Sequence, residues 1–111
     1  MEVFDPASNH GDGGWKLLKG IGVPIDAFGC VVMGGLIYAA GGDGADTVLR
    51  DVNTFDPRTN HWRKIVSMRT PRSSFRAATL EGSIYVVGGY NGLSSDKHER
   101  LQTVESLHGH Q

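Results

Sequence analysis

The sequence predicts an all-β protein built from repeated four-stranded antiparallel units, and three observations lead to this prediction. Glycine occurs 16 times in 111 residues without a three-residue period, which favours many tight turns and close backbone approaches. The chain repeats itself at a nearly constant spacing. No stretch longer than about ten residues spaces its apolar side chains as a helix would, so essentially no helix is expected.

The repeat is clearest in two apolar segments that each end in a pair of glycines. FGCVVMGGLIYAAGG at 28–42 aligns with FRAATLEGSIYVVGG at 75–89, with an offset of 47 residues throughout. A second pair, VFDPASNH and TFDPRTNH, aligns with an offset of 51, and Trp15 then aligns with Trp62 at 47 again. The insertion GDGG before Trp15 accounts for the difference. One unit therefore occurs about two and a half times.

One complete unit is expected to contain four short strands. Gly34-Gly35 is a strong signal for a two-residue hairpin between the first and second strands. Pro57 ends the third strand because proline cannot donate to a central ladder. Trp62 begins a fourth segment that contains β-branched residues. The predicted strands are 28–33, 36–40, 52–56 and 62–66.

The remaining sequence supplies incomplete copies of the same unit. The second copy is expected to form strands at 75–80, 84–87 and 103–107, and the front of the chain to form strands at 2–4 and 15–18. An antiparallel four-stranded unit that recurs every 40 to 50 residues is typical of a β-propeller blade. We therefore expect an incomplete propeller of about two to two and a half blades. Its parts are a partial blade at 1–26, a complete blade at 27–66, a second blade without its fourth strand at 67–107, and a tail at 108–111.

At these residues the chain resembles the kelch-repeat family, whose pattern is an apolar run into a double glycine, a spaced aromatic residue and then a tryptophan. The complete unit meets the pattern with LIYAAGG, Phe55 and Trp62. The second unit has SIYVVGG, but Leu107 stands in place of the aromatic residue and no tryptophan follows. TPRSSF at 70–75 also fits the family, whereas Ile25 replaces the expected arginine in the first copy. The structural repeat residues are Tyr38, Gly41, Gly42, Phe55, Trp62, Tyr85, Gly88 and Gly89, with Phe4 and Trp15 in the leading half-unit.

A closed kelch propeller uses about five to seven blades, which hides both faces of every blade. Two blades alone would expose two apolar sheet faces. The length therefore indicates a fragment of a longer protein, a subunit of an oligomeric ring that associates through these faces, or a truncated product. The abrupt beginning and end inside a blade favour a fragment or a truncated form.

Composition excludes several other classes of function. The formal net charge is -1, without a basic stripe, so no nucleic-acid partner is expected. No apolar run approaches the length of a membrane span, and no signal peptide is recognisable. The single Cys30 cannot form an internal disulfide, which favours a reducing compartment, the cytoplasm or the nucleus.

No catalytic, metal or cofactor site is predicted. Asp96, His98 and Glu99 are close in sequence but lie in a segment without a helical frame to fix their geometry. Cys30 lies in an apolar strand and is expected to be a small buried residue. GDGADT at 42–47 has no following helix or lysine, so it does not fit a phosphate-binding loop. The other candidate ligands considered are His10, His61, His108 and His110.

A protein-binding surface is predicted on the loops at one end of the blades. The second and third strands are joined by long connections, 43–51 and 90–102, and the connection 67–72 should emerge at the same end. Arginine and tyrosine often anchor interfaces, and in well-studied kelch domains the same loops line the binding surface, which this arrangement resembles. The alternative is a set of solvated loop charges. The candidate residues are Arg50, Arg69, Arg72, Tyr90, Asn91, Lys97, His98 and Arg100.

The resemblance implies a module that binds another protein. Its commonest setting is substrate recognition for a cullin-type ubiquitin ligase, with an F-box segment, as in plant-type F-box/kelch proteins, or a BTB segment elsewhere in the chain. A cytoskeletal scaffold that binds actin is the alternative. A metal-dependent enzyme, such as the kelch family's copper radical oxidase or its iron-dependent plant specifier proteins, is a third candidate.

Overall fold

The computed structural model describes residues 2–4, 15–17, 20, 28–92 and 100–108. All the regular secondary structure in these ranges is β, as the sequence predicts. The strands are β1 (Glu2–Phe4), β2 (Trp15–Leu17), β3 (Gly29–Met33), β4 (Leu36–Asp43), β5 (Val48–Asp56), β6 (His61–Ser67), β7 (Arg76–Leu80), β8 (Ser83–Val87) and β9 (Val104–His108).

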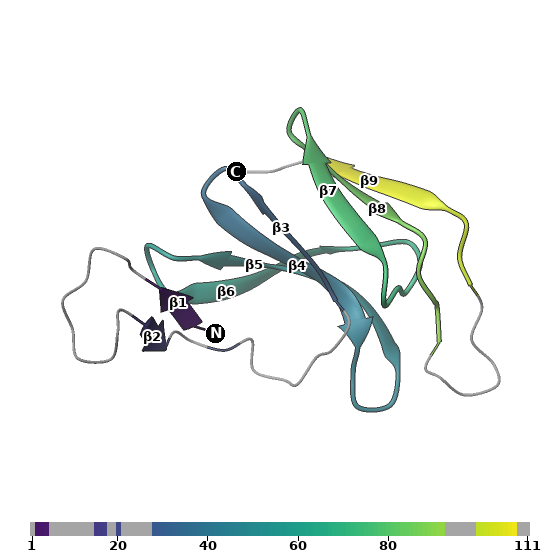
Figure 1. Ribbon diagram of the computed structural model, residues 1–111, viewed down its shortest axis with the longest axis horizontal. Coiled ribbons are helices and arrows are strands. Elements are labelled where there is room, and N and C mark those ends of the chain that lie inside the picture. The colour runs from purple at the N-terminus through teal and green to yellow at the C-terminus, as the bar shows by residue number, and fades with distance from the viewer. Residues whose placement is uncertain (1, 5–14, 18–19, 21–27, 93–99, 109–111) are drawn as a thin grey trace.

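The strands form three antiparallel sheets in which neighbours in the sequence are neighbours in space (Figure 1). β3, β4, β5 and β6 form a four-stranded sheet, called here the first sheet. β7, β8 and β9 form a three-stranded sheet, called here the second sheet, and β1 pairs with β2. The Cα register places Phe4 opposite Trp15 in this short pair. The four-stranded and three-stranded meanders confirm an incomplete propeller architecture.

The first sheet differs from its prediction at one end. β4 continues to Asp43 through a β-bulge between Ala40 and Gly42, and β5 already begins at Val48. Gly41 and Gly42 have φ angles of 61° and 101°, which let the strand bend without ending. The connection predicted at 43–51 was therefore wrong in length, because it is a short hairpin turn.

The two hairpins at the opposite end use the same backbone conformation with different residues. Gly34 and Gly35 have φ angles of 60° and 79°, and Glu81 and Gly82 have φ angles of 50° and 81°. These values are those of a two-residue type I′ turn, in which both central residues have positive φ. The glycine pair was recognisable from the sequence, whereas Glu81 occupies this conformation without the freedom of glycine.

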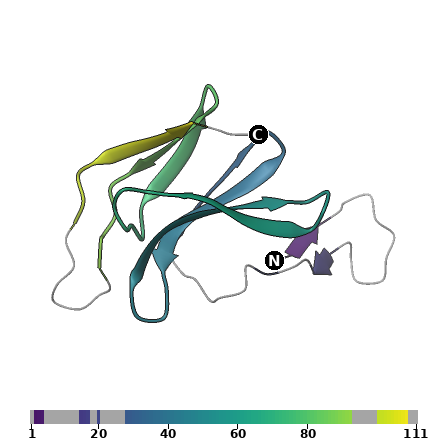
Figure 2. The ribbon, with the colours of Figure 1, turned by 180° about the vertical axis from the view of Figure 1, so that it is seen from behind.

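The core lies between the first and second sheets, which pack with β3 next to β7 (Figures 1 and 2). Tyr38, Ala40 and Val52 of the first sheet contact one cluster with Ile84 and Val86 of the second. Met68 and Phe75, from the chain that joins the sheets, complete it. Burial of these side chains on facing sheets supplies most of the driving force for their association.

The outward face of the second sheet repeats the pattern of this buried face but is uncovered. Tyr38 is 3% exposed, whereas Tyr85, its counterpart in the repeat, is 37% exposed. Val52 is 3% exposed, and Val104 is 57% exposed. The difference follows from position, because the first sheet is covered by the second and the second sheet has no described neighbour on that side.

On the other face of the first sheet, the two aromatic residues of the repeat stack on each other. The rings of Phe55 and Trp62 lie 5.1 Å apart between centroids and are tilted by 48°. They are directly opposite in the register of β5 and β6, and Phe55 is fully buried. Such tilted pairs add to the stabilisation from burial alone.

Candidate partner-binding loop face

The connection between β6 and β7, residues 68–75, is bonded to the loop ends of both large sheets. The Met68 N–H donates to the Arg50 carbonyl at 2.8 Å, and the Arg72 N–H donates to the Leu49 carbonyl at 3.1 Å. Ser73 and Tyr90 exchange two backbone hydrogen bonds of 2.9 Å. The predicted arrangement of these connections at one end of the blades is therefore confirmed. We call this end the loop face.

The paired glycines allow the connection to pack this closely. A Cβ atom on Gly41 would lie 2.8 Å from Cε of Met68, besides meeting the Arg72 carbonyl, and one on Gly89 would lie 2.8 Å from Cβ of Phe75. Both glycines also have positive φ. The double glycine of the repeat thus positions the loop face by letting backbone approach backbone.

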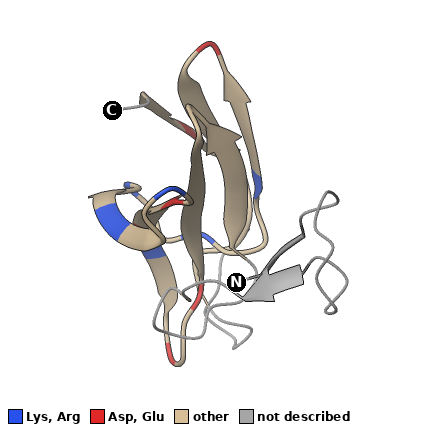
Figure 3. Ribbon diagram, turned by 90° about the vertical axis from the view of Figure 1, so that its left-hand side faces the viewer, with Lys and Arg blue, Asp and Glu red and all other residues tan. Residues whose placement is uncertain are grey.

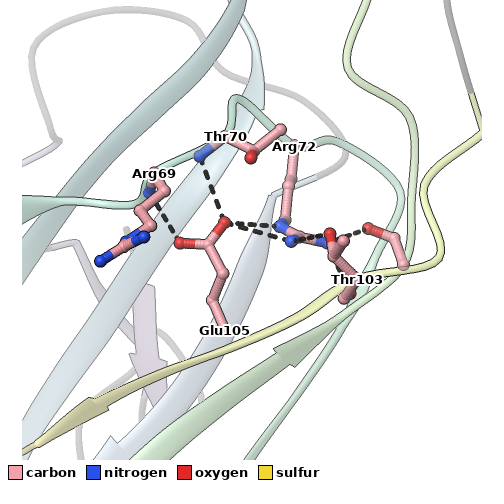
Figure 4. A network of polar contacts seen from close by, with 6 residues as sticks. Arg69, Thr70, Arg72, Thr103 and Glu105 are labelled. Atoms are coloured by element: carbon pink, nitrogen blue, oxygen red, sulfur yellow. Dashed lines mark hydrogen bonds and ion pairs between the residues drawn. The ribbon is translucent and has the colours of Figure 1, made fainter.

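Arg72 is at the centre of a buried polar network beneath the loop face (Figure 4). Its guanidinium pairs with the carboxylate of Glu105 on β9 at 3.1 Å. It also donates to the carbonyls of Gly88 and Thr103 at 2.9 and 3.0 Å, and to the Thr103 hydroxyl at 2.6 Å. These contacts tie the β6–β7 connection to the far strand of the second sheet.

Glu105 accepts hydrogen bonds from the connection as well as from Arg72. The Arg69 N–H donates at 2.6 Å and the Thr70 N–H at 3.2 Å. Burial raises the pKa of the Glu105 carboxyl, but the hydrogen bonds from Arg69, Arg72 and Thr70 outweigh burial, so its net pKa is lowered. Glu105 is therefore ionised, and the network holds a fully formed ion pair at neutral pH.

The prediction that Arg72 is a partner-contacting residue needs correction, because its side chain is 0% exposed. The sequence alone did not indicate its partner, since Glu105 lies 33 residues away. A signal for the pair is nevertheless present in the repeat. Arg72 corresponds to Ile25 and Glu105 to Asn53, so both charges occur in one copy and both are missing from the other.

Three predicted arginines remain exposed at the loop face: Arg50, Arg69 and Arg100. Arg50 belongs to strand β5 rather than to a loop. The guanidinium of Arg100 lies 6.0 Å from the centre of the Tyr90 ring, which is within the range of a cation–π contact. In Figure 3, the lysine and arginine segments (blue) and the aspartate and glutamate segments (red) are both distributed over the described ribbon.

The remaining predicted residues of this face divide into two groups. Tyr90 and Asn91 are half-buried. Lys97 and His98 lie outside the described residues, as do Asp96 and Glu99. The structure therefore brings together Arg50, Arg69, Tyr90, Asn91 and Arg100, with Arg72 beneath them.

Near the same end, the carboxylate of Asp43 has one oxygen, Oδ1, that is buried and has no hydrogen-bond partner among the residues that the structure describes. Asp43 is the last residue of β4, beside the short β4–β5 turn. In that turn the Gly44 N–H donates to the Thr47 carbonyl at 2.8 Å. This oxygen is therefore an unsatisfied acceptor within the described structure near the loop face, and it is not exposed for a partner to contact.

The histidines and the cysteine do not form a reactive cluster in the part of the chain that is described. His61 is exposed on β6, and His108 shares a hydrogen bond of 3.0 Å with the Ser83 hydroxyl. His10 and His110 lie outside the described residues. Cys30 was predicted to be buried, but its side chain is exposed, because it is on the face of β3 that points away from the second sheet. Partial burial raises the pKa of the Cys30 thiol, which makes it less reactive as a nucleophile.

The described ranges lack both a metal-binding cluster and a membrane-spanning helix. They contain no group of three or more histidine, cysteine, aspartate or glutamate side chains that could hold a metal ion. They also contain no helix of the length and apolar character needed to cross a membrane.

Comparison with known proteins gives consistent matches over most of the chain. The model of the kelch motif matches residues 26–69 and 71–108. The influenza virus NS1A-binding protein homolog of Mus musculus is 48% identical over 68 residues, 61% of this chain. The Kelch-like ECH-associated protein 1A of Danio rerio is 34% identical over 93 residues, 80% of this chain.

Among solved structures, that of YjhT superposes with a TM-score of 0.67 at 28% sequence identity, over 75% of this chain. These proteins are much longer than the chain described here. The chain spans 11% of the mouse relative, 15% of the zebrafish relative and 26% of YjhT.

Proposed function

The chain belongs to the kelch-repeat family of protein-binding modules, and from this premise we propose that it recognises substrates for a cullin-type ubiquitin ligase. In this role the loop face contacts the substrate, and the ligase is engaged by a part of the protein that lies outside this chain. The proposal assigns the chain a binding role without catalysis, in the cytoplasm or nucleus.

The observation that supports the proposal most strongly is the combination of exposed arginines and a rigid base at the loop face. Arg50, Arg69 and Arg100 extend from segments that are hydrogen-bonded to one another, above the buried Arg72–Glu105 pair. A preformed surface loses little conformational entropy on binding. The exposed guanidinium groups favour a partner segment that is rich in acidic side chains, because charge complementarity guides association.

The relatives support the protein-binding part of the proposal, and the ligase part rests on the commonest setting of kelch modules. A Kelch-like ECH-associated protein aligns with 80% of this chain, and a second zebrafish relative of that name aligns with 85%. The influenza virus NS1A-binding protein homologs bear names that state a protein partner. Binding to another protein is thus the property suggested by both groups of relatives.

The test compares proteins captured from cells by the chain and by a triple variant, Arg50→Ala/Arg69→Ala/Arg100→Ala. We expect the triple variant to lose its specific partners. A control variant, Arg63→Ala/Lys64→Ala, removes positive charge from β6 outside the loop face and should retain them. Captured partners should be short-lived in cells and should accumulate when cullin neddylation is inhibited.

Two outcomes would contradict different parts of the proposal. Identical partners for the triple variant and the parent chain would exclude the loop face as the contact surface. Specific partners whose lifetime does not respond to cullin inhibition would exclude the ligase role and would favour a scaffold, with actin as a direct candidate to assay by co-sedimentation.

A further inference from the structure

A second recess lies at the end of the sheets opposite the loop face. It has a volume of about 480 Å³ and is lined by the inward face of the first sheet, the β5–β6 turn and Gly82 of the β7–β8 turn. Small-molecule sites typically have volumes of about 300–1,000 Å³. We call this recess the turn-end groove. It shares none of the residues predicted for partner binding.

The side chains of the groove change from apolar to polar across the sheet, because they lie in rows that cross its strands. Tyr38 is opposite Thr54, and Thr54 is opposite Arg63, on three adjacent strands. Residues directly opposite in antiparallel strands point to the same face, so these three side chains form one row. The row runs from an aromatic ring on β4 to a guanidinium on β6.

A neighbouring row of side chains shows the same change from apolar to polar. Met33 is opposite Leu36 on the inner strands, and Asp56 is opposite His61 on the outer strands. The inner half of the groove is therefore apolar and its outer half is polar. A ligand that fits both halves must have an apolar body and a polar or charged end.

The hydroxyl of Tyr38 belongs to the wall of the groove and has no hydrogen-bond partner among the described residues. The residue as a whole is 3% exposed, because its ring packs in the core between the two sheets. The neighbouring Thr54 hydroxyl already donates to the Arg63 carbonyl at 3.3 Å. The Tyr38 oxygen is not among the fully buried, unsatisfied atoms of the described residues, so water reaches it from the groove and a ligand acceptor could replace that water.

Positive charge at the outer end of the groove is also available to a ligand. In the described chain, Asp56 pairs with Arg58 at 3.3 Å and Asp51 with Lys64 at 3.4 Å. The guanidinium of Arg63 has no ion-pair or hydrogen-bond partner among the described residues. The acidic side chain of the groove is thus already neutralised, whereas Arg63 is not.

We propose that the turn-end groove binds a small carboxylate with an aliphatic or aromatic body. The carboxylate lies over Thr54, where it accepts hydrogen bonds from the Tyr38 hydroxyl and the Arg63 guanidinium. Neighbouring strands are about 4.8 Å apart, so both long side chains reach this middle position of their row. The body of the ligand packs on Met33 and Leu36.

The experiment titrates the chain with 4-phenylbutyrate and follows backbone amide shifts by NMR spectroscopy. We expect shifts centred on β4, β5 and β6 near the groove. The neutral alcohol 4-phenylbutan-1-ol, which keeps the body and lacks the charge, should bind about tenfold more weakly, as expected for loss of one charge-assisted interaction. Inorganic phosphate, which keeps a charge and lacks the body, should cause no saturable shift there.

Three variants assign the contacts. Arg63→Gln should weaken 4-phenylbutyrate binding about tenfold and leave binding of the alcohol unchanged. Tyr38→Phe keeps the ring and removes only the hydroxyl, so it should weaken the carboxylate several-fold. Lys64→Gln is the matched control, because Lys64 neighbours Arg63 on β6 but faces the other side of the sheet, and it should bind as the parent chain does.

Several results would overturn the proposal. These are an absence of shifts at the groove, equal binding of the alcohol and the carboxylate, saturable binding of phosphate alone, or undiminished binding by Arg63→Gln. Thermal unfolding of each variant verifies that it is folded. The triple arginine variant of the loop face should bind the carboxylate normally, so the two proposals stand or fall separately.

Discussion

Gly41 and Gly89 show how a single missing side chain positions a surface. Each glycine has positive φ and lies where the backbone of the β6–β7 connection passes. The hairpin glycine Gly82 shares the positive φ but has open space around its Cα. Conformational freedom alone is therefore needed at Gly82, whereas Gly41 and Gly89 need both freedom and space.

Substitution by alanine should separate these two requirements. Gly82→Ala introduces only backbone strain and should lower the free energy of unfolding by about 1–2 kcal/mol. Gly41→Ala adds a collision with Met68 and the Arg72 carbonyl, so it should cost about 3 kcal/mol or more. Urea denaturation of both variants measures the difference. Equal losses would mean that the connection moves aside without cost.

The Arg72–Glu105 pair makes stability depend on pH in a defined direction. The folded pKa of Glu105 is lowered, so its ionised form contributes stability above the unfolded pKa. That contribution is lost as the pH falls through the folded pKa. Acidification should therefore weaken the link between β9 and the connection.

Glu105→Gln should lower the free energy of unfolding by about 2–3 kcal/mol at pH 7, because it leaves the buried Arg72 without a counter-charge. The deficit relative to the parent chain should shrink as the pH falls through the lowered folded pKa of Glu105, where the parent also loses the charge. Denaturation curves measured between neutral and acidic pH give this comparison. A deficit that does not change with pH would contradict the role of the ionised carboxylate.

At the scale of the strands and turns, most of the architecture could be predicted because its signals are local. The glycine hairpin at Gly34-Gly35, the position of Trp62 and the sequence repeat predicted seven strands close to their observed bounds. The errors arose where tertiary contacts decide. The bulge at Gly41 depends on the connection packed against it, and the length of the β4–β5 turn follows from that bulge.

The candidate site was less predictable for the same reason. The backbone topology implied that the loops gather at one end, and this is correct. Which arginine is buried depends on a carboxylate from a distant strand, so Arg72 could not be told apart from Arg69 by residue type. Cys30 was misplaced because an apolar strand at the margin of two sheets has one covered and one open face.

The hairpin between β7 and β8 offers a stabilising change. Glu81 adopts φ of 50°, which costs a non-glycine residue about 1 kcal/mol and which asparagine tolerates better. Glu81→Asn creates the favoured Asn-Gly turn and should raise the free energy of unfolding by up to about 1 kcal/mol. Glu81→Gln removes the charge and keeps the strain, so it should have little effect. A similar gain from both variants would assign the effect to charge instead.

At the scale of the whole molecule, the two large sheets carry the same pattern in different surroundings. Val52 and Val104 occupy corresponding positions, but one is inside the core and the other is in solvent. Leu80, Tyr85 and Val87 are exposed on the same outward face as Val104. This face is the apolar surface that a further blade would cover in a complete propeller.

The same substitution at the two positions should therefore have opposite consequences. Val52→Thr places a hydroxyl in the core and should cost about 1–3 kcal/mol. Val104→Thr should change stability by less than about 0.5 kcal/mol and should reduce binding of a hydrophobic dye to the native chain. Denaturation and dye fluorescence measure these effects. A large loss of stability in Val104→Thr would show that this face is covered in solution.

The β6–β7 connection determines how cooperatively the two large sheets unfold. Neighbouring units of a repeat protein can melt one after another when each contacts the next only weakly. Here residues 68–75 bond to β5 on one side and to Tyr90 on the other, with the Arg72 guanidinium fixed to Thr103 and Glu105. Neither sheet can open without breaking bonds that also hold its neighbour. The two sheets should thus form one cooperative unit, in which the amide protons of Arg72 and Ser73 exchange with solvent only when the whole chain unfolds.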